Sequence, residues 1–251
     1  MNLADYHLDQ WRLMHIGAQP VPKSLVERWL AVFPNQQYDT NYGLSESMGP
    51  GCVHLGVDNV GHVGAIGVPG YRWECKIVDE KGAEVEPGEV GELCVKGPGL
   101  MDCYYKDPAA TAETLIDGWL HTGDMARQDE GGFYWLVDRK KDVIIMGGEN
   151  IYPVQIEDYL MGHPAIQDVA VIGIPDERLG EISCAVIELK PDAAPVTQED
   201  IEKFCLGLPR YKRPRKVIFA HVPRNPTGKI EKPALRAKYG AASLVDYENR
   251  R

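Results

Sequence analysis

The most informative part of this chain is GWLHTGD (118–124), followed by a glycine pair at 131–132 and by FYWLVDRKKDVIIMGGENIY (133–152). Strand-like runs flank the glycine pair, so the sequence predicts a hairpin with Asp124 before it and Arg139 after it. A carboxylate can accept two hydrogen bonds from a sugar diol, and a guanidinium can add donors to a ribose or phosphate. An Asp–Arg surface ion pair, which contributes little to stability, is the alternative interpretation.

The chain divides into three segments that differ in their pattern of expected strands, helices and glycines. Residues 11–41 alternate strand, helix and strand (11–18, 23–33 and about 37–41), which is the edge of a β/α arrangement. Residues 55–137 hold short alternating runs between glycines, which predicts an antiparallel sheet or distorted barrel. The remainder reads as a compact α+β unit of ordinary domain size.

Local signals place further elements. Asp107 is expected to cap a helix over 107–115 with Pro108 in its first turn, and Thr197 is a candidate cap for the helix that follows it. Further expected elements are a helix over 154–163, strands over 168–176, 181–190 and 217–222, and a glycine loop over 225–230.

Composition limits the functional classes. The chain has 251 residues, 44% hydrophobic content and a net charge of −10, which suits a globular protein and disfavours general binding to nucleic acid or anionic membranes. The 6 cysteines have no zinc spacing, so buried free thiols in a reducing cytosol are expected. No apolar run has the length of a membrane span, and the histidines show no ligand spacing. A cytoplasmic location without stable membrane insertion is therefore expected.

YGLSE (42–46) brings an aromatic ring, a hydroxyl and a carboxylate together on a predicted turn after a strand. Tyr42 could stack on a base, Ser45 could reach a phosphate oxygen, and Glu46 could help hold Mg²⁺, which prefers oxygen ligands. The alternative is an ordinary surface turn. GAQP (17–20) follows the preceding strand and could line the same pocket, because ligands of open α/β sheets bind beyond the carboxyl ends of the strands.

Two basic features lie near the end of the chain. Lys229, in the loop PTGKI, could neutralise charge that develops on a phosphate or carboxylate oxygen, and a solvated loop lysine is the alternative. RYKRPRK (210–216) has five cationic residues and favours a local phosphate site over a genomic-DNA surface, with a solvated linker or an RNA site as alternatives.

The order of these motifs resembles the adenylate-forming superfamily, which includes acyl-CoA synthetases, peptide-synthetase adenylation domains and firefly luciferase. GAQP, YGLSE, GELCVKGPGLMDCYYKDPAAT, GWLHTGD, DRKKDVIIMGGENIYPVQIE and PTGKI occur in the family's sequence and spacing, over about residues 12–236. GGENIYP (147–153) resembles the acyl-CoA synthetase type more than the peptide-synthetase type.

The resemblance implies both the fold and the domain limits. Residues 1–138 would be the end of a large N-terminal domain, with a β/α edge and an antiparallel barrel-like subdomain. Residues 139–142 would be a hinge, and residues 143–251 a small α+β C-terminal domain.

The resemblance also implies roles for individual residues. Lys229, Glu46 and Ser45 would be catalytic, with Ser45 standing where the family usually has threonine and Glu46 also holding Mg²⁺. Lys141 would be the hinge residue. The nucleotide-binding residues would be Gly17, Ala18, Gln19, Pro20, Asn41, Tyr42, Gly43, Asp124 and Arg139. The coenzyme A-binding residues would be Gly148, Tyr211, Arg213 and Arg215.

The implied activity is that of an acid–thiol ligase of fatty-acid metabolism that uses ATP, Mg²⁺ and coenzyme A. A carboxylic acid would form an acyl-adenylate, and coenzyme A would then displace AMP. The family's Ser/Thr/Gly-rich phosphate loop does not occur upstream of GAQP, so we expect the chain to be the C-terminal portion of a longer ligase and inactive alone. A non-catalytic nucleotide- or partner-binding fragment is the alternative, and a homodimer is an option.

Overall fold

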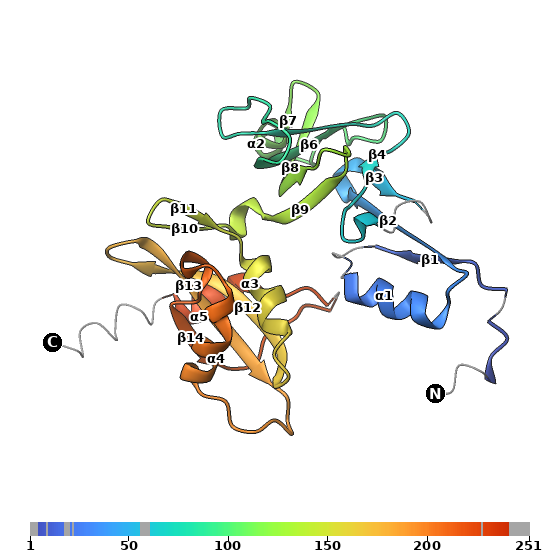
Figure 1. The fold of residues 1–251 in the computed structure, drawn as a ribbon. Helices are drawn as coiled ribbons and strands as arrows, with labels where there is room; N and C mark the ends of the chain where they lie inside the picture. Colours follow the sequence, from blue (N-terminus) through green and yellow to red (C-terminus); the bar gives the residue numbers. More distant parts are fainter. Residues whose placement is uncertain are drawn as a thin grey trace. The chain divides into compact units, whose positions relative to one another are not determined.

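The computed structural model describes residues 5–8, 10–17, 21, 23–55, 61–226 and 228–240 (Figure 1). The chain divides into two compact units, Met1–Val137 and Asp138–Arg251. Each unit has apolar clusters of its own, so each has a core that its own strands and helices build.

The first sheet of the first unit contains the predicted β/α edge. Its strands lie in the order β1-β2-β3-β4, with β1 and β2 parallel and the other neighbours antiparallel. Helix α1 connects β1 to β2, and its Val26 is fully buried in a cluster with Met14 and Tyr38. The elements are β1 (Leu13–Ile16), α1 (Lys23–Val32), β2 (Gln37–Leu44), β3 (Gly49–His54) and β4 (Val68–Pro69).

One sequence expectation about this sheet is wrong. The segment 42–44 is not a turn but the end of β2, because Tyr42 pairs with Cys52 and Leu44 with Gly49 on β3. The turn is the short 3₁₀ segment η2 (Ser45–Ser47) that follows. Strand β3 was not expected from its glycine- and proline-containing sequence.

The second sheet of the first unit is antiparallel, as predicted. Its strands lie in the order β5-β6-β8-β7, and β9 pairs with β8. The predicted hairpin is present, because Asp129 N donates to Phe133 O at 2.9 Å and Gly132 adopts a φ of 82° in the turn. The strands are β5 (Glu74–Val78), β6 (Val90–Lys96), β7 (Leu115–Ile116), β8 (Trp119–Gln128) and β9 (Tyr134–Arg139).

The predicted caps are confirmed. Asp107 Oδ1 accepts a hydrogen bond from Ala110 N at 2.9 Å and begins α2 (Pro108–Thr114). Thr197 and Asp200 form a reciprocal capping box at the start of α4 (Gln198–Phe204).

The second unit is a sheet covered on both faces. Alternate residues of β12 belong to different clusters: Val169 and Val171 pack with α3, and Ala170 and Ile172 pack with α5. The strand order is β11-β10-β13-β12, with β14 parallel to β13. The elements are η4 (Lys140–Asp142), β10 (Ile144–Met146), β11 (Glu149–Ile151), α3 (Pro153–Met161), β12 (Ile166–Asp176), β13 (Gly180–Leu189), α4, η5 (Cys205–Gly207), η6 (Arg210–Lys212), β14 (Lys216–Phe219) and α5 (Lys232–Tyr239).

All 6 cysteines are free thiols, but the expectation that they are buried is wrong for two of them. Cys103 is exposed, because the segment that carries it runs irregularly over the surface before α2, and Cys75 is only partly covered. No helix in the described part of the chain combines the length and apolarity of a membrane span.

Candidate functional site

Two of the predicted site segments meet at one edge of the first sheet. Strands β1 and β2 are parallel with Ile16 opposite Thr40, so Gly17, which follows the end of β1, lies beside Asn41 within β2. A Cβ atom on Gly17 would lie 3.2 Å from Asn41 Oδ1, which shows how closely the backbone approaches this amide. The expected neighbours Ala18, Gln19 and Pro20 lie outside the described residues.

Tyr42 and Asp124 form the centre of the candidate site. The Tyr42 hydroxyl donates to Asp124 Oδ2 at 2.6 Å, and the two residues are only 8% and 7% exposed. Burial, and then the charge of Asp124, raise the pKa of Tyr42 far above its usual value. The phenol therefore stays protonated and remains a donor to the carboxylate. This contact joins β2 of the first sheet to β8 of the second.

A bulge in β8 sets the position of Asp124. Cys94 on β6 pairs with His121, and Glu92 pairs with Met125, so β8 has two more residues than β6 between these pairs. Gly123 makes the bulge possible with a φ of 70°, a conformation that disfavours residues with a Cβ. Asp124 is thereby placed on the buried side of β8, beside the core.

Glu92 holds this bulge from the neighbouring strand. Its Oε1 accepts a hydrogen bond from Gly123 N at 3.1 Å, and its Oε2 lies 3.2 Å from His121 Nδ1. Thr122 Oγ1 adds a second tie, donating to Leu93 O at 2.6 Å and accepting from Asp124 N at 3.1 Å. Neither role was predicted from the sequence, although Glu92 lies inside the motif GELCVKG (91–97).

Glu46 lies on η2, the turn that follows β2. Its Oε1 accepts a hydrogen bond from the Tyr104 hydroxyl at 2.8 Å, and its backbone carbonyl accepts from Met101 N at 2.8 Å. The bond to Glu46 raises the pKa of Tyr104. Ser45, beside it, is exposed. Tyr104 was not singled out from the sequence, because its contact spans 58 residues of chain.

Glu46 has the chemistry of a magnesium ligand that shares the ion with substrate phosphates and water. Mg²⁺ is commonly held by one or two carboxylates together with substrate phosphates and water. Glu46 is a partly exposed carboxylate, and the described residues contain no group of three His, Cys, Asp or Glu side chains placed to hold a metal by themselves. Its role in holding the ion stays a prediction.

The predicted hinge lies on η4, at the start of the second unit. Lys141 is exposed, whereas Asp138 and Asp142 on either side of it are buried. Asp138 accepts hydrogen bonds from Arg139 N at 2.7 Å and Val154 N at 2.9 Å. Asp142 accepts from Arg236 at 2.5 Å. The predicted hinge segment is therefore tied to α3 and α5, while Lys141 is exposed to solvent.

An ion pair between a buried lysine and a largely buried glutamate joins the two helices that hold this segment, α3 and α5. Lys232, the first residue of α5, lies 2.8 Å from the Glu157 carboxylate on α3. Glu157 also accepts from Val171 N at 2.7 Å and so satisfies an edge of β12. Burial raises the pKa of Glu157, against the opposing influence of Lys232. Neither residue was expected from the sequence to have a role.

Gly148 lies in a two-residue turn between β10 and β11. Met146 pairs with Glu149, and Gly147 and Gly148 both have positive φ values, 61° and 90°. Positive φ at both central residues defines the type I′ hairpin turn that favours glycine. A Cβ atom on Gly148 would meet no atom within 4 Å, so the turn exposes an open backbone surface.

Lys229 is exposed on a short loop whose shape is held by hydrogen bonds within the loop and to Arg224. Asn225 Oδ1 accepts from Lys229 N at 2.9 Å, and Arg224 donates to Gly228 O at 2.6 Å. Arg224 also forms a bidentate ion pair with Asp168, donating from Nε to Oδ2 at 2.6 Å and from Nη2 to Oδ1 at 2.8 Å. These hydrogen bonds raise the pKa of Arg224. Arg224 precedes the quoted loop and was not assigned a role from the sequence.

The basic segment 210–216 is not uniformly solvated. Arg213 donates to the carbonyl oxygens of Leu206 and Leu208, both at 2.9 Å, so its guanidinium shapes the loop. Tyr211 is 42% exposed, and Arg215 is exposed as well. The exposed pair are therefore the stronger candidates for contact with a ligand.

Within the first unit, the structure brings together Gly17 with Asn41 and Tyr42 with Asp124. Gly43 and Ser45 lie next to them along the chain, at the end of β2 and on η2. Arg139, Lys141, Gly148, Tyr211, Arg213, Arg215 and Lys229 all belong to the second unit. The assignment of all these residues to ligands stays a prediction.

Comparison with known proteins defines the class of protein. The family pattern described as AMP-binding enzyme matches residues 1–105, and the pattern described as AMP-binding enzyme C-terminal domain matches residues 155–229. The chain belongs to this adenylate-forming family, which confirms the resemblance predicted from its motifs.

Particular relatives narrow the similarity to acyl-CoA ligases. A long-chain-fatty-acid–CoA ligase from Mycobacterium tuberculosis is 38% identical over 95% of this chain and 47% of the relative. Feruloyl-CoA synthase from an Amycolatopsis species is 38% identical over 93% of this chain and 47% of the relative. The o-succinylbenzoate CoA synthetase of Bacillus subtilis, solved with its acyl-adenylate intermediate, has a TM-score of 0.82 at 32% identity, over 90% of this chain and 46% of that one. The chain thus spans about half the length of these relatives.

Proposed function

We propose that this chain is part of an acid–thiol ligase that activates a carboxylic acid with ATP and transfers the acyl group to coenzyme A. The observation that carries the proposal is the buried Tyr42–Asp124 contact, which joins two family motifs from two different sheets. Similarity to acyl-CoA ligases supports the reaction type. The acid is a small molecule whose identity the proposal leaves open.

The proposed reaction has two steps. A substrate carboxylate oxygen attacks the α-phosphorus of ATP, an acyl-adenylate forms, and pyrophosphate leaves. The sulfur of coenzyme A then attacks the acyl carbon, and AMP leaves. Glu46 would hold Mg²⁺, and the ion would neutralise charge on the phosphates.

Different residues of the chain contribute to different steps. Gly17–Pro20, Asn41, Tyr42 and Gly43 would form the adenine pocket, Ser45 would contact the α-phosphate, and Asp124 and Arg139 would hold the ribose. Lys229 would stabilise charge that develops during adenylation. Lys141 would be the pivot between the steps, within a hinge over 139–142. Gly148, Tyr211, Arg213 and Arg215 would serve coenzyme A.

Titration of AMP into the 251-residue chain by calorimetry tests the ribose role of Asp124. We expect AMP to bind, and Asp124→Asn to weaken it by about tenfold, roughly 1.4 kcal/mol. Asp102→Asn, which changes an exposed carboxylate of the same unit, is the matched control and should leave affinity unchanged.

A ligand change gives an independent arm of this test. AMP without its ribose hydroxyls (2′,3′-dideoxy-AMP) should bind the wild type weakly and lose little more with Asp124→Asn, because both changes remove the same contact. Equal affinity of the wild type for AMP and the dideoxy analogue would refute the ribose clamp. If the chain binds neither AMP nor coenzyme A, the alternative of a module that only binds a partner protein is favoured.

Lys229 is expected to serve adenylation alone. In the longer parent ligase, Lys229→Ala should lower acid-dependent ATP–pyrophosphate exchange by about 100-fold or more. Thioester formation from supplied acyl-AMP should stay nearly unchanged, and Lys238→Ala, on the exposed part of α5, is the control. Equal loss in both half-reactions would contradict this role. The 251 residues alone are expected to show no exchange.

A further inference from the structure

Two cysteine thiols meet inside the first unit, apart from the residues used above. Cys52 lies on β3 and Cys75 on β5, and their Sγ atoms are 3.5 Å apart. Cys52 is fully buried, and the Cys75 thiol also lies 3.7 Å from Gly51 O. The pair connects the two sheets of the unit. Cys52 is the residue that pairs with Tyr42 in the first sheet, and β5 belongs to the second sheet, which contains Asp124.

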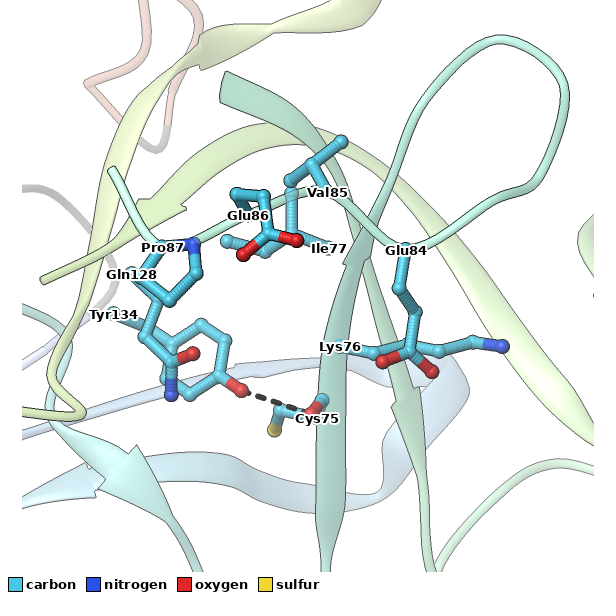
Figure 2. A pocket seen from close by; sticks show the side chains of 9 residues that line it. All are labelled: Cys75, Lys76, Ile77, Glu84, Val85, Glu86, Pro87, Gln128 and Tyr134. Atoms are coloured by element: carbon cyan, nitrogen blue, oxygen red, sulfur yellow. Dashed lines mark hydrogen bonds between the residues drawn. The ribbon is translucent and has the colours of Figure 1, made fainter. Parts of the chain in front are cut away.

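Cys75 is partly exposed and lines a cavity of about 110 Å³. Figure 2 shows the residues that line this cavity, with Glu84 beside Lys76 and Glu86 nearer Pro87, and with the Tyr134 hydroxyl donating to Cys75 O at 2.8 Å. A water molecule occupies roughly 30 Å³ of the liquid, so the cavity has room for a solute of the size of hydrogen peroxide.

We propose that Cys52 and Cys75 form an oxidation site, which a hydroperoxide converts into a disulfide that cross-links the two sheets. The Cys75 sulfur attacks the peroxide, an S–O bond forms, and the O–O bond breaks with release of water or alcohol. The Cys52 sulfur then attacks the sulfenic acid, an S–S bond forms, and the second oxygen leaves as water. The two thiols lose two protons and two electrons, which the peroxide takes up.

The required movement is small. A disulfide has an S–S distance near 2.05 Å, so the sulfur atoms must approach by about 1.5 Å. A bulge lies next to Cys52, because Tyr42 pairs with Cys52 but Gly43 pairs with Pro50, which leaves Gly51 between the pairs. Bulges interrupt the ladder locally, so this segment can adjust without breaking the rest of β3.

The environment also predicts the pH dependence of the reaction. The hydrogen bond to Cys75, and then burial, raise the pKa of Cys52, whose thiolate is the nucleophile of the second step, in which the disulfide forms. Besides Cys75, the titratable groups that interact with Cys52 include the Tyr42 and Tyr134 hydroxyls, whose raised pKa values keep them neutral. The charged side chains that line the cavity with Cys75 are Lys76, Glu84 and Glu86. Oxidation should therefore be slow at neutral pH and faster in alkaline solution.

The test uses the full chain with Cys103→Ser, which removes the exposed thiol. Hydrogen peroxide should lower the intact mass by about 2 Da and yield a peptide that links residues 52 and 75, both reversed by a phosphine reductant. The rate should be higher at about pH 8.5 than at about pH 6.5. Cys52→Ser and Cys75→Ser should each abolish the product, and Cys94→Ser, a buried thiol of the same unit, should retain it.

Two results would overturn the proposal. One is a gain of about 16 or 32 Da without a 52–75 linked peptide, which indicates separate oxidation of single thiols. The other is an undiminished loss of about 2 Da in Cys52→Ser, which places the disulfide elsewhere. The peptide that links residues 52 and 75 is measured in the Cys103→Ser protein. The test therefore remains decisive even if Cys52→Ser or Cys75→Ser folds poorly. None of these measurements depends on nucleotide binding. The oxidation site and the proposed function can therefore be refuted independently of each other.

Discussion

At the scale of single residues, Tyr42 and Tyr38 differ in hydrogen bonding, although they lie on the same strand. Both are buried tyrosines of β2. The Tyr42 hydroxyl donates to Asp124, whereas the Tyr38 hydroxyl has no hydrogen-bond partner among the described residues. The same substitution should therefore have different consequences at the two positions.

Tyr42→Phe is expected to lower the free energy of unfolding by about 1–3 kcal/mol, because it removes a donor from a buried carboxylate. Tyr38→Phe is the matched control and should be neutral or stabilising, since it removes a buried hydroxyl that makes no bond. Urea denaturation followed by tryptophan fluorescence measures both. A loss of equal size in the two variants would mean that ring packing, not the Asp124 contact, decides the outcome.

Asp138 provides a pH-dependent prediction. Burial raises its pKa, against the opposing influence of Lys232 and two backbone N–H groups. The folded state therefore binds this proton more tightly than the unfolded state, and the stability that protonation contributes is lost as pH rises from about 4 through the folded pKa. The stability of the wild type relative to Asp138→Asn should fall over this range, by about 1.4 kcal/mol for each unit of pKa difference.

Denaturation of both proteins at a series of pH values measures this difference. Asp192→Asn, a change at an exposed carboxylate of the same unit, should show no such trend. A stability difference that rises with pH would show that hydrogen bonds to the charged carboxylate outweigh its burial.

At the scale of elements, the Gly147–Gly148 turn links local backbone geometry to the hairpin it closes. Gly148→Ala is expected to lower stability by about 1–2 kcal/mol, because φ of 90° disfavours a Cβ even though the added methyl group meets no atom within 4 Å. Gly148→Asn should be tolerated better, since asparagine enters positive φ more readily. Thermal unfolding compares the two variants, and equal effects would argue against backbone strain.

At the scale of the whole molecule, the second unit has the features of an independent domain. Its sheet is covered on both faces by its own helices, with Leu160 fully buried on α3. Residues 138–251 expressed alone should unfold cooperatively. Leu160→Ala should cost about 2–5 kcal/mol, and the change Met161→Ala, at an exposed neighbour on the same helix, should cost little. Circular dichroism on heating measures both, and a broad, non-cooperative melt would contradict independence.

The same scale separates what the sequence predicts from what it does not. The order of motifs predicts the family, and cap residues such as Asp107 and Thr197 predict helix starts, because these signals are local along the chain. Strand β3 escaped prediction because pairing partners, not propensity, hold its glycines in a ladder. The contacts Glu92–Gly123 and Glu157–Lys232 escaped because they span 31 and 75 positions of chain and depend on packing.

The bulge in β8 makes the chain length between Trp119 and Gln128 a constraint in its own right. Two inserted residues, an even number, keep Leu120 and Ala126 on the buried side, whereas a single deletion would turn every following side chain to the opposite face. A deletion of both residues would restore a regular ladder and lose the bulge that positions Asp124. Alignments of related chains should therefore contain neither gaps nor insertions across these ten positions.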